Sequence, residues 1–249
     1  MPRTIVSDYY AGVTNLAEEK EPNISLLAWG GPGVGKTQLM GTFPNLFVID
    51  TDMGLLTLAG KDVKRFSIKS EMQVYETCIN IIQDAKYKRG PFASGGGLED
   101  IETIGLDSFS KLSIILFEEI LEEQSKDKRQ AYNVLLKRLT TIASLLRELN
   151  DYGYHVVATA GETYKENDLG IVKPMPLING SFREYVAHYF DASVWMEVIK
   201  KNGKPVYMTY CLQEKGHEAK TRFDLPEKVE NASFETFKEA LDKRFQKED

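Results

Sequence analysis

Short, mainly apolar runs recur along the chain and predict buried strands. They cover residues 24–29, 45–50, 101–107 and 153–160. Runs with so little polar alternation are typical of strands that are covered on both faces of a parallel sheet. We therefore expect these four segments to form the centre of a mostly parallel sheet.

Helical patterns separate the apolar runs. The segments with helical periodicity are 36–43, 71–87, a long region of roughly 110–151 that is broken near 125–130, and an amphipathic stretch at 232–246. An alternation of strand and helix predicts an open α/β fold in which helices flank a mostly parallel sheet. The last amphipathic helix is expected to pack on the sheet, because its polar face mixes acidic and basic residues.

The remaining segments predict loops and one hairpin. Residues 87–100 and 161–181 contain glycines and prolines that oppose regular structure, so both are expected to be surface loops. Residues 191–199 and 204–215 predict an antiparallel pair, since the Asn-Gly at 202–203 suits a tight primed turn.

Composition narrows the class of protein. The chain has 249 residues and a net charge of −6, which argues against nucleic-acid binding through bulk positive charge. We expect a single domain over 1–249, with 1–22 as an N-terminal arm. The two cysteines, Cys78 and Cys211, fit a reducing compartment, and no apolar run approaches the roughly 18 residues of a membrane span. A cytoplasmic protein without membrane contact is the expectation.

The strongest chemical signal is a glycine-rich turn after the first strand. Residues 30–37 read GGPGVGKT and match the phosphate-loop pattern G-x-x-x-x-G-K-[ST] between a strand and a helix. Glycines let backbone N–H groups surround phosphate oxygens at a helix N-terminus. The residues expected to bind the nucleotide are Gly31, Pro32, Gly33, Val34, Gly35, Lys36, Thr37 and Gln38. Lys36 should reach the β- and γ-phosphates, while Thr37 should coordinate Mg²⁺; a plain glycine turn with an exposed lysine is the alternative.

Two other strands end in carboxylates. Asp107 closes 101–107 and is followed by Ser108, so it fits the Walker B role of holding magnesium; a helix N-cap is the alternative. Asp50 and Asp52 follow the second strand. AAA+ enzymes carry a second acid directly after the Walker B aspartate, but Ser108 occupies that position here. We therefore expect Asp52 to activate the attacking water. The alternative is that Asp50 and Asp52 only cap a turn.

This order of features resembles the RecA core. More narrowly, the chain is similar to the small phage-encoded RecA-core ATPases of the Sak type, which are implicated in single-strand annealing and recombination. The similarity covers about 26–225 and is carried by GGPGVGKT, LFVIDTDMG, IGLDSFSKL, VVATAGETYKENDLG, P-x-P-L-x-x-G and AKTRFDLP. RecA-like enzymes carry glutamate at the position of Asp52, so the aspartate implies slower hydrolysis.

The resemblance implies further roles. A sensor of the γ-phosphate would lie at Thr159 or Glu162. Residues 163–181 would be a mobile loop that contacts DNA, with basic side chains offset by acidic ones; a plain surface loop is the alternative. The members of this set are Tyr164, Lys165, Lys173 and the nearby Arg183, opposed by Glu166 and Asp168.

The resemblance also implies assembly. Lys220 and Arg222 would reach the ATP of a neighbouring subunit in a homo-oligomeric ring or filament and neutralise charge on the γ-phosphoryl group. On an isolated chain, the same pair would be a solvated strand edge.

The main hypothesis is therefore an ATP- and Mg²⁺-dependent hydrolase that acts on single-stranded DNA. It would serve phage recombination or annealing in the bacterial cytoplasm, with a single-strand-binding protein as a further partner. The alternatives are a nucleotide or small-molecule kinase, a non-hydrolysing switch or loader, and an AAA+ motor. A kinase needs a lid with arginines, and Arg138, Arg147 and Arg183 do not form a clear one. An AAA+ motor should have a helical lid domain where 191–215 predict strands.

The other conspicuous residues have structural interpretations. Trp29 and Trp195 lie in strand patterns and are expected in the core. The three histidines, His155, His188 and His217, lack metal-ligand spacing with the cysteines, so no zinc site is predicted.

Overall fold

The computed structural model describes most of the chain. The described residues are 23–69, 72–123, 127–166, 170, 172–214 and 216–245. The predicted arm, 1–22, and Asp168 lie outside them. Within the described residues, no helix is both long and apolar enough to cross a membrane.

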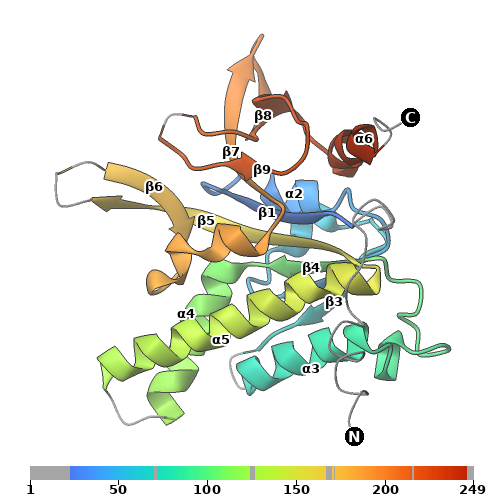
Figure 1. Ribbon diagram of the computed structural model, residues 1–249, viewed down its shortest axis with the longest axis vertical. Helices are drawn as coiled ribbons and strands as arrows, with labels where there is room; N and C mark the ends of the chain where they lie inside the picture. Colours follow the sequence, from blue (N-terminus) through green and yellow to red (C-terminus); the bar gives the residue numbers. More distant parts are fainter. Residues whose placement is uncertain are drawn as a thin grey trace, which may run out of the picture.

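A ten-stranded sheet forms the centre of the molecule (Figure 1). Its main order is β10-β8-β7-β1-β5-β4-β2-β3, with β6 paired to β5 and β9 paired to β7. The strands are β1 (Ser25–Gly30), β2 (Leu46–Asp50), β3 (Lys64–Ser67), β4 (Thr103–Asp107), β5 (His155–Glu166), β6 (Val172–Leu177), β7 (Ala192–Lys201), β8 (Lys204–Tyr210), β9 (Lys220–Thr221) and β10 (Lys228–Glu230). The pairs from β3 through β7 are parallel, which confirms the predicted fold class.

Helices cover both faces of the sheet. They are α2 (Lys36–Met40), α3 (Val74–Lys86), α4 (Phe109–Glu123), α5 (Lys128–Glu148) and α6 (Phe234–Phe245), with short 3-10 turns η2 (Leu55–Leu58), η3 (Gly90–Phe92), η4 (Leu149–Tyr152), η5 (Ser181–Glu184) and η6 (Val186–Tyr189). Figure 1 shows α3, α4 and α5 on one face, and α2 and α6 on the other. The predicted break between α4 and α5 is confirmed, because Asp127 caps α5 by accepting from the N–H groups of Arg129 and Gln130.

Burial on both faces explains the apolar strand sequences. In β1, Leu27 and Trp29 join the core beneath α3, α4 and α5, whereas Leu26 and Ala28 join the core beneath α2 and α6. Successive side chains of a strand point to opposite faces, so a doubly covered strand needs apolar residues at every position. The predicted core positions of Trp29 and Trp195 and the predicted packing of the last helix are confirmed.

The prediction of a long loop over 161–181 was wrong. Strand β5 continues to Glu166 and pairs with β6 as an antiparallel hairpin. The two prolines that argued against a strand, Pro174 and Pro176, lie in β6, which pairs only with β5 within the described residues. Residues two apart direct their nitrogens to the same side of a strand, so both prolines can face away from β5 without losing a ladder hydrogen bond.

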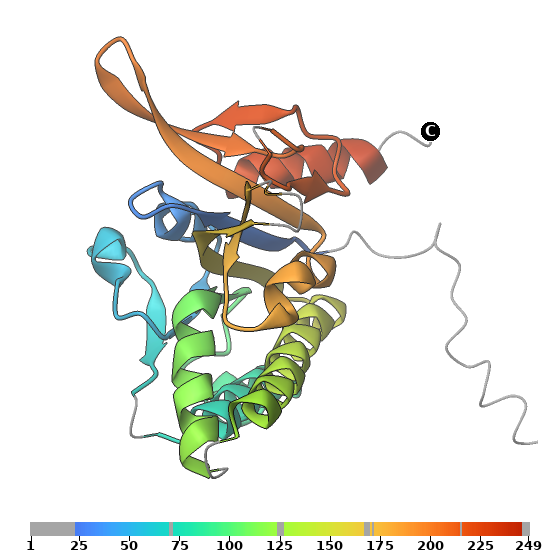
Figure 2. The same ribbon diagram turned by 90° about the vertical axis from the view of Figure 1, so that its left-hand side faces the viewer.

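The predicted hairpin at 191–215 is confirmed, although its second strand is shorter. Asn202 and Gly203 join β7 and β8 with φ angles of 53° and 78°, the left-handed conformation that a primed turn requires. Figure 2 shows this hairpin projecting beyond the rest of the sheet. Strands β3, β9 and β10 were not predicted, because two to four residues are too few to show a period.

Candidate nucleotide-binding site

The phosphate loop lies where the sequence placed it, between the end of β1 and the start of α2. Gly33 and Gly35 have φ angles of +72° and +90°, which L side chains rarely adopt. These turns let the chain reverse direction and enter α2 at Lys36. The result is a run of backbone N–H groups that ends at a helix N-terminus, which is the geometry of a phosphate site.

Neighbouring strands enclose the loop tightly. A Cβ on Gly30 would lie 2.3 Å from the backbone oxygen of Met196 in β7, and a Cβ on Gly35 would lie 2.8 Å from the Tyr207 ring in β8. Neither position can therefore hold a side chain without movement of its neighbour. The glycines serve close packing as well as backbone conformation.

Lys36 lies at the centre of the site. Its Nζ donates hydrogen bonds to the carbonyl oxygens of Gly30 and Gly31, at 3.0 and 2.6 Å. Burial lowers the pKa of Lys36, and the carboxylates of Asp107, Asp52 and Glu162 oppose that shift, in decreasing order. The lysine thus lies among acids from three places: the end of β4, the turn after β2, and the part of β5 that pairs with β6.

Thr37 and Asp107 meet as the magnesium hypothesis requires. The Thr37 hydroxyl donates to Asp107 Oδ2 at 3.0 Å, and the Thr159 hydroxyl donates to Asp107 Oδ1. Burial raises the pKa of Asp107, and these two hydrogen bonds oppose the rise. Hydroxyl and carboxylate oxygens are ligands that Mg²⁺ prefers, and a cation would offset the burial of the carboxylate. The donor set therefore fits Mg²⁺.

The two acids after β2 have different environments. Asp50 is fully buried, accepts from the N–H of Met53 at 2.8 Å, and lies 3.8 Å from Arg65, so it caps the turn. Asp52 is exposed, and its charge acts on both Lys36 and Asp107. Asp52 alone of this pair is therefore available to contact a water near the phosphates.

The two candidate sensors are also in different places. Thr159 is buried and bonded to Asp107, whereas Glu162 reaches the phosphate loop, with its Oε2 3.7 Å from the position of a Cβ on Gly31. The other oxygen of Glu162 lies 2.6 Å from Nε2 of His217. Sequence reasoning missed His217, because 55 residues separate it from Glu162 and no motif marks it.

Lys220 and Arg222 are not brought to the phosphate loop of their own chain. Lys220 pairs with Ser193 near the start of β7, three residues before Met196, which pairs with Gly30. Arg222 forms an ion pair with Asp191 at 2.8 Å. Burial and then the charge of Arg222 lower the pKa of Lys220.

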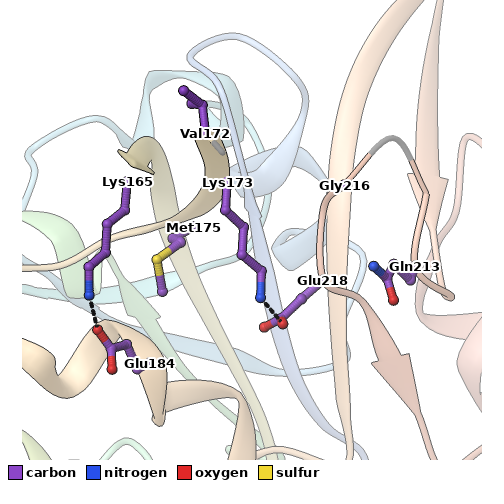
Figure 3. A pocket seen from close by; sticks show the side chains of 8 residues that line it. All are labelled: Lys165, Val172, Lys173, Met175, Glu184, Gln213, Gly216 and Glu218. Atoms are coloured by element: carbon purple, nitrogen blue, oxygen red, sulfur yellow. Dashed lines mark hydrogen bonds and ion pairs between the residues drawn. The ribbon is translucent and has the colours of Figure 1, made fainter. Parts of the chain in front are cut away.

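The β5–β6 hairpin carries the lysines that were predicted to contact DNA. Lys165 pairs with Glu184 at 2.5 Å, and Lys173 pairs with Glu218. These four side chains line a cavity of about 590 Å³ between the hairpin and the segment that leads to β9 (Figure 3). Tyr164, on the same hairpin, is 62% exposed.

The arginines considered for a kinase lid have structural partners. Arg138 bonds to Glu119 and Glu123 of α4, and its position on α5 places it in a helix–helix contact. Arg147 donates to the carbonyl of His188, and Arg183 donates to that of Gly180. The contacts of these arginines do not favour the kinase alternative.

Comparison with known proteins identifies the family. A family model described as an AAA domain matches residues 22–223. No curated protein matches the chain. Among solved structures, a KaiC-like protein from the hyperthermophilic archaeon Pyrococcus horikoshii OT3 is similar at 14% identity and a TM-score of 0.44, covering 84% of this chain and 89% of that one. Because the family model covers most of the sequence, including the phosphate loop and Asp107, the chain belongs to this AAA-domain family.

Proposed function

We propose that this protein binds ATP with Mg²⁺ and hydrolyses it. The observation that carries the proposal is the 3.0 Å contact between Thr37 and Asp107 beside the phosphate loop. Thr37 and Asp107 would hold the ion, which when bound neutralises charge on the β- and γ-phosphates. Membership of the AAA-domain family supports the same conclusion.

Each residue of the site would have a separate role in hydrolysis. The backbone N–H groups within 31–38, which every residue except Pro32 carries, bind the phosphates. Lys36 gives up its hydrogen bonds to the carbonyls of Gly30 and Gly31 and donates to phosphate oxygens instead. Asp52 accepts a proton from the attacking water, because it is exposed and its charge acts on Lys36. Binding thus replaces contacts within the loop by contacts to the substrate.

The test is phosphate release by Lys36→Ala compared with the parent protein. The matched control is Lys137→Ala, because Lys137 is exposed on α5, away from the phosphate loop. We expect Lys36→Ala to lose at least 100-fold in turnover, roughly the value of an electrostatic contact to the transferring group, while Lys137→Ala stays at the parent rate. Undiminished turnover in Lys36→Ala would refute the assignment, and ATP binding without turnover in the parent would favour a switch.

We also propose that the ATPase acts on single-stranded DNA as a homo-oligomer, in phage recombination or annealing. The hairpin supports this because it carries two cations, Lys165 and Lys173, on one face and the exposed ring of Tyr164 on the other, and cations and aromatic rings are the groups that bind single strands. Lys165 and Lys173 form ion pairs with Glu184 and Glu218. These ion pairs would have to break before the lysines could contact DNA phosphates. A trans role for Lys220 and Arg222 belongs to the same proposal.

DNA binding can be measured by fluorescence anisotropy with a labelled oligothymidylate. The double variant Lys165→Ala/Lys173→Ala should weaken binding about 10-fold and reduce the slope of log K against log salt by about 1.4, which is about 0.7 for each lysine. Lys128→Ala/Lys137→Ala on α5 is the charge-matched control. If the two double variants bind the oligonucleotide with equal affinity, the lysines of the β5–β6 hairpin do not contact DNA.

A further inference from the structure

Glu162 lies where β5 leaves the main sheet. The last residue of β5 that pairs with β1 is Ala160, opposite Trp29, and the next residues pair with β6. Because Trp29 directly precedes the phosphate loop, this junction places Glu162 beside Gly31, with Oε2 3.7 Å from where a Cβ would stand. One oxygen of Glu162 therefore faces the end of the loop where Lys36 Nζ lies.

The second oxygen of Glu162, Oε1, is held by His217. His217 Nε2 lies 2.6 Å from Oε1, and both side chains are largely buried, with 10% of His217 and 13% of Glu162 exposed. With its proton on Nε2, the imidazole donates this hydrogen bond. Its Nδ1 is buried and has no hydrogen-bond partner among the described residues.

Two tryptophans, Trp195 and Trp29, form an aromatic wall that holds the His217 ring in place. The ring stacks on Trp195 with centroids 3.5 Å apart and planes at 17°, and Trp29 lies 5.7 Å away. Both tryptophans are core residues of neighbouring strands, so the ring cannot swing without disturbing the sheet. The imidazole is thus a rigid support for a carboxylate whose other oxygen, Oε2, faces the phosphate loop.

We propose that Glu162 is a second carboxylate that orients the attacking water in the ATP site, and that His217 is its positioning residue. The inference rests on the proposed ATPase function and adds two residues to it. Position favours Glu162 for this role over Thr159, whose hydroxyl is engaged by Asp107.

The chemical step balances with residues already assigned. The water oxygen forms a bond to the γ-phosphorus while the bond from that phosphorus to the β–γ bridging oxygen breaks, and its electron pair leaves with ADP. One proton of the water passes to Asp52 and then to solvent or phosphate. The other hydrogen is held by Oε2 of Glu162, which aims the oxygen along the line of attack.

The experiment compares steady-state turnover of two substitutions at His217. His217→Gln keeps an N–H donor at the reach of Nε2, whereas His217→Asn keeps an amide that is too short. We expect His217→Asn to lower kcat about 10- to 100-fold with KM for ATP unchanged within about twofold, the cost of a misplaced reacting group. His217→Gln should recover to within about threefold of the parent. A purely structural role of His217 would not lower kcat while leaving KM unchanged, and it would not let glutamine restore the rate.

A second variant keeps the test independent of the aromatic wall. Glu162→Gln leaves His217 stacked on Trp195 and should lower kcat to the same degree, while thermal melting and binding of a fluorescent ATP analogue match the parent. Combining Glu162→Gln with His217→Asn should cost no more than Glu162→Gln alone, because both remove one interaction.

Three results overturn the inference. They are kcat within twofold of the parent in Glu162→Gln, equal kcat in His217→Gln and His217→Asn, and additive losses in the double variant. If Lys36→Ala loses turnover and any of these three results is found, the roles of Glu162 and His217 are refuted while the proposed ATPase function stands. A parent without turnover overturns the proposed function and this inference together.

Discussion

The glycines of the phosphate loop provide a graded test of the site's geometry. Replacement of Gly31, Gly33 or Gly35 by alanine adds the same methyl group at three positions with different surroundings. Gly31 has no left-handed φ and would meet only ordinary contacts, the nearest at 3.7 Å. Gly33 has φ +72° with nothing within 4 Å, and Gly35 has φ +90° with the Tyr207 ring at 2.8 Å.

The expected losses in the free energy of unfolding follow from these surroundings. Gly31→Ala should change stability by no more than about 0.5 kcal/mol, as at an unconstrained surface site. Gly33→Ala should cost about 1–2 kcal/mol, the penalty of a left-handed L residue. Gly35→Ala carries the same backbone penalty and an overpacking penalty of about 1–3 kcal/mol against Tyr207, so we expect roughly 2–5 kcal/mol in total.

Urea unfolding of the three variants, monitored by tryptophan fluorescence, measures these values. A double variant, Gly35→Ala with Tyr207→Leu, separates the two penalties, because removing the ring should recover the overpacking part but not the backbone part. The reasoning fails if Gly35→Ala is no less stable than Gly33→Ala, or if Gly31→Ala is as damaging as either.

Two further predictions concern pH and assembly. Burial lowers the pKa of His155 from 6.5 to about 4, so between these values the folded protein binds fewer protons than the unfolded chain and stability falls as pH drops. At pH 5 the loss should be about 2 kcal/mol in the parent and smaller in His155→Gln, by urea unfolding. If Lys220 and Arg222 act across subunits, turnover per chain should rise with protein concentration, and Lys220→Ala or Arg222→Ala should abolish the rise; a flat parent rate would contradict the trans role.

Local sequence was sufficient for the parts of the site that are contiguous. The phosphate loop at 30–37 is a single turn between two elements, so its glycines specify its conformation, and its lysine and threonine predict the phosphate and magnesium contacts proposed above. Asp107 could be predicted for the same kind of reason, because the carboxyl ends of parallel strands meet at one edge of the sheet. Strands that are buried on both faces could also be predicted, because their sequences are almost continuously apolar.

Tertiary structure alone decided which distant side chains meet. The hairpin over 161–177 was hidden because prolines are excluded from central strands but tolerated at an edge, and only pairing makes β6 an edge. Likewise, Glu184 and Glu218 reach the hairpin lysines, and His217 reaches Glu162, across gaps in sequence that no period or motif spans. Such contacts depend on how the sheet orders its strands, a property of the whole packed chain rather than of any one segment.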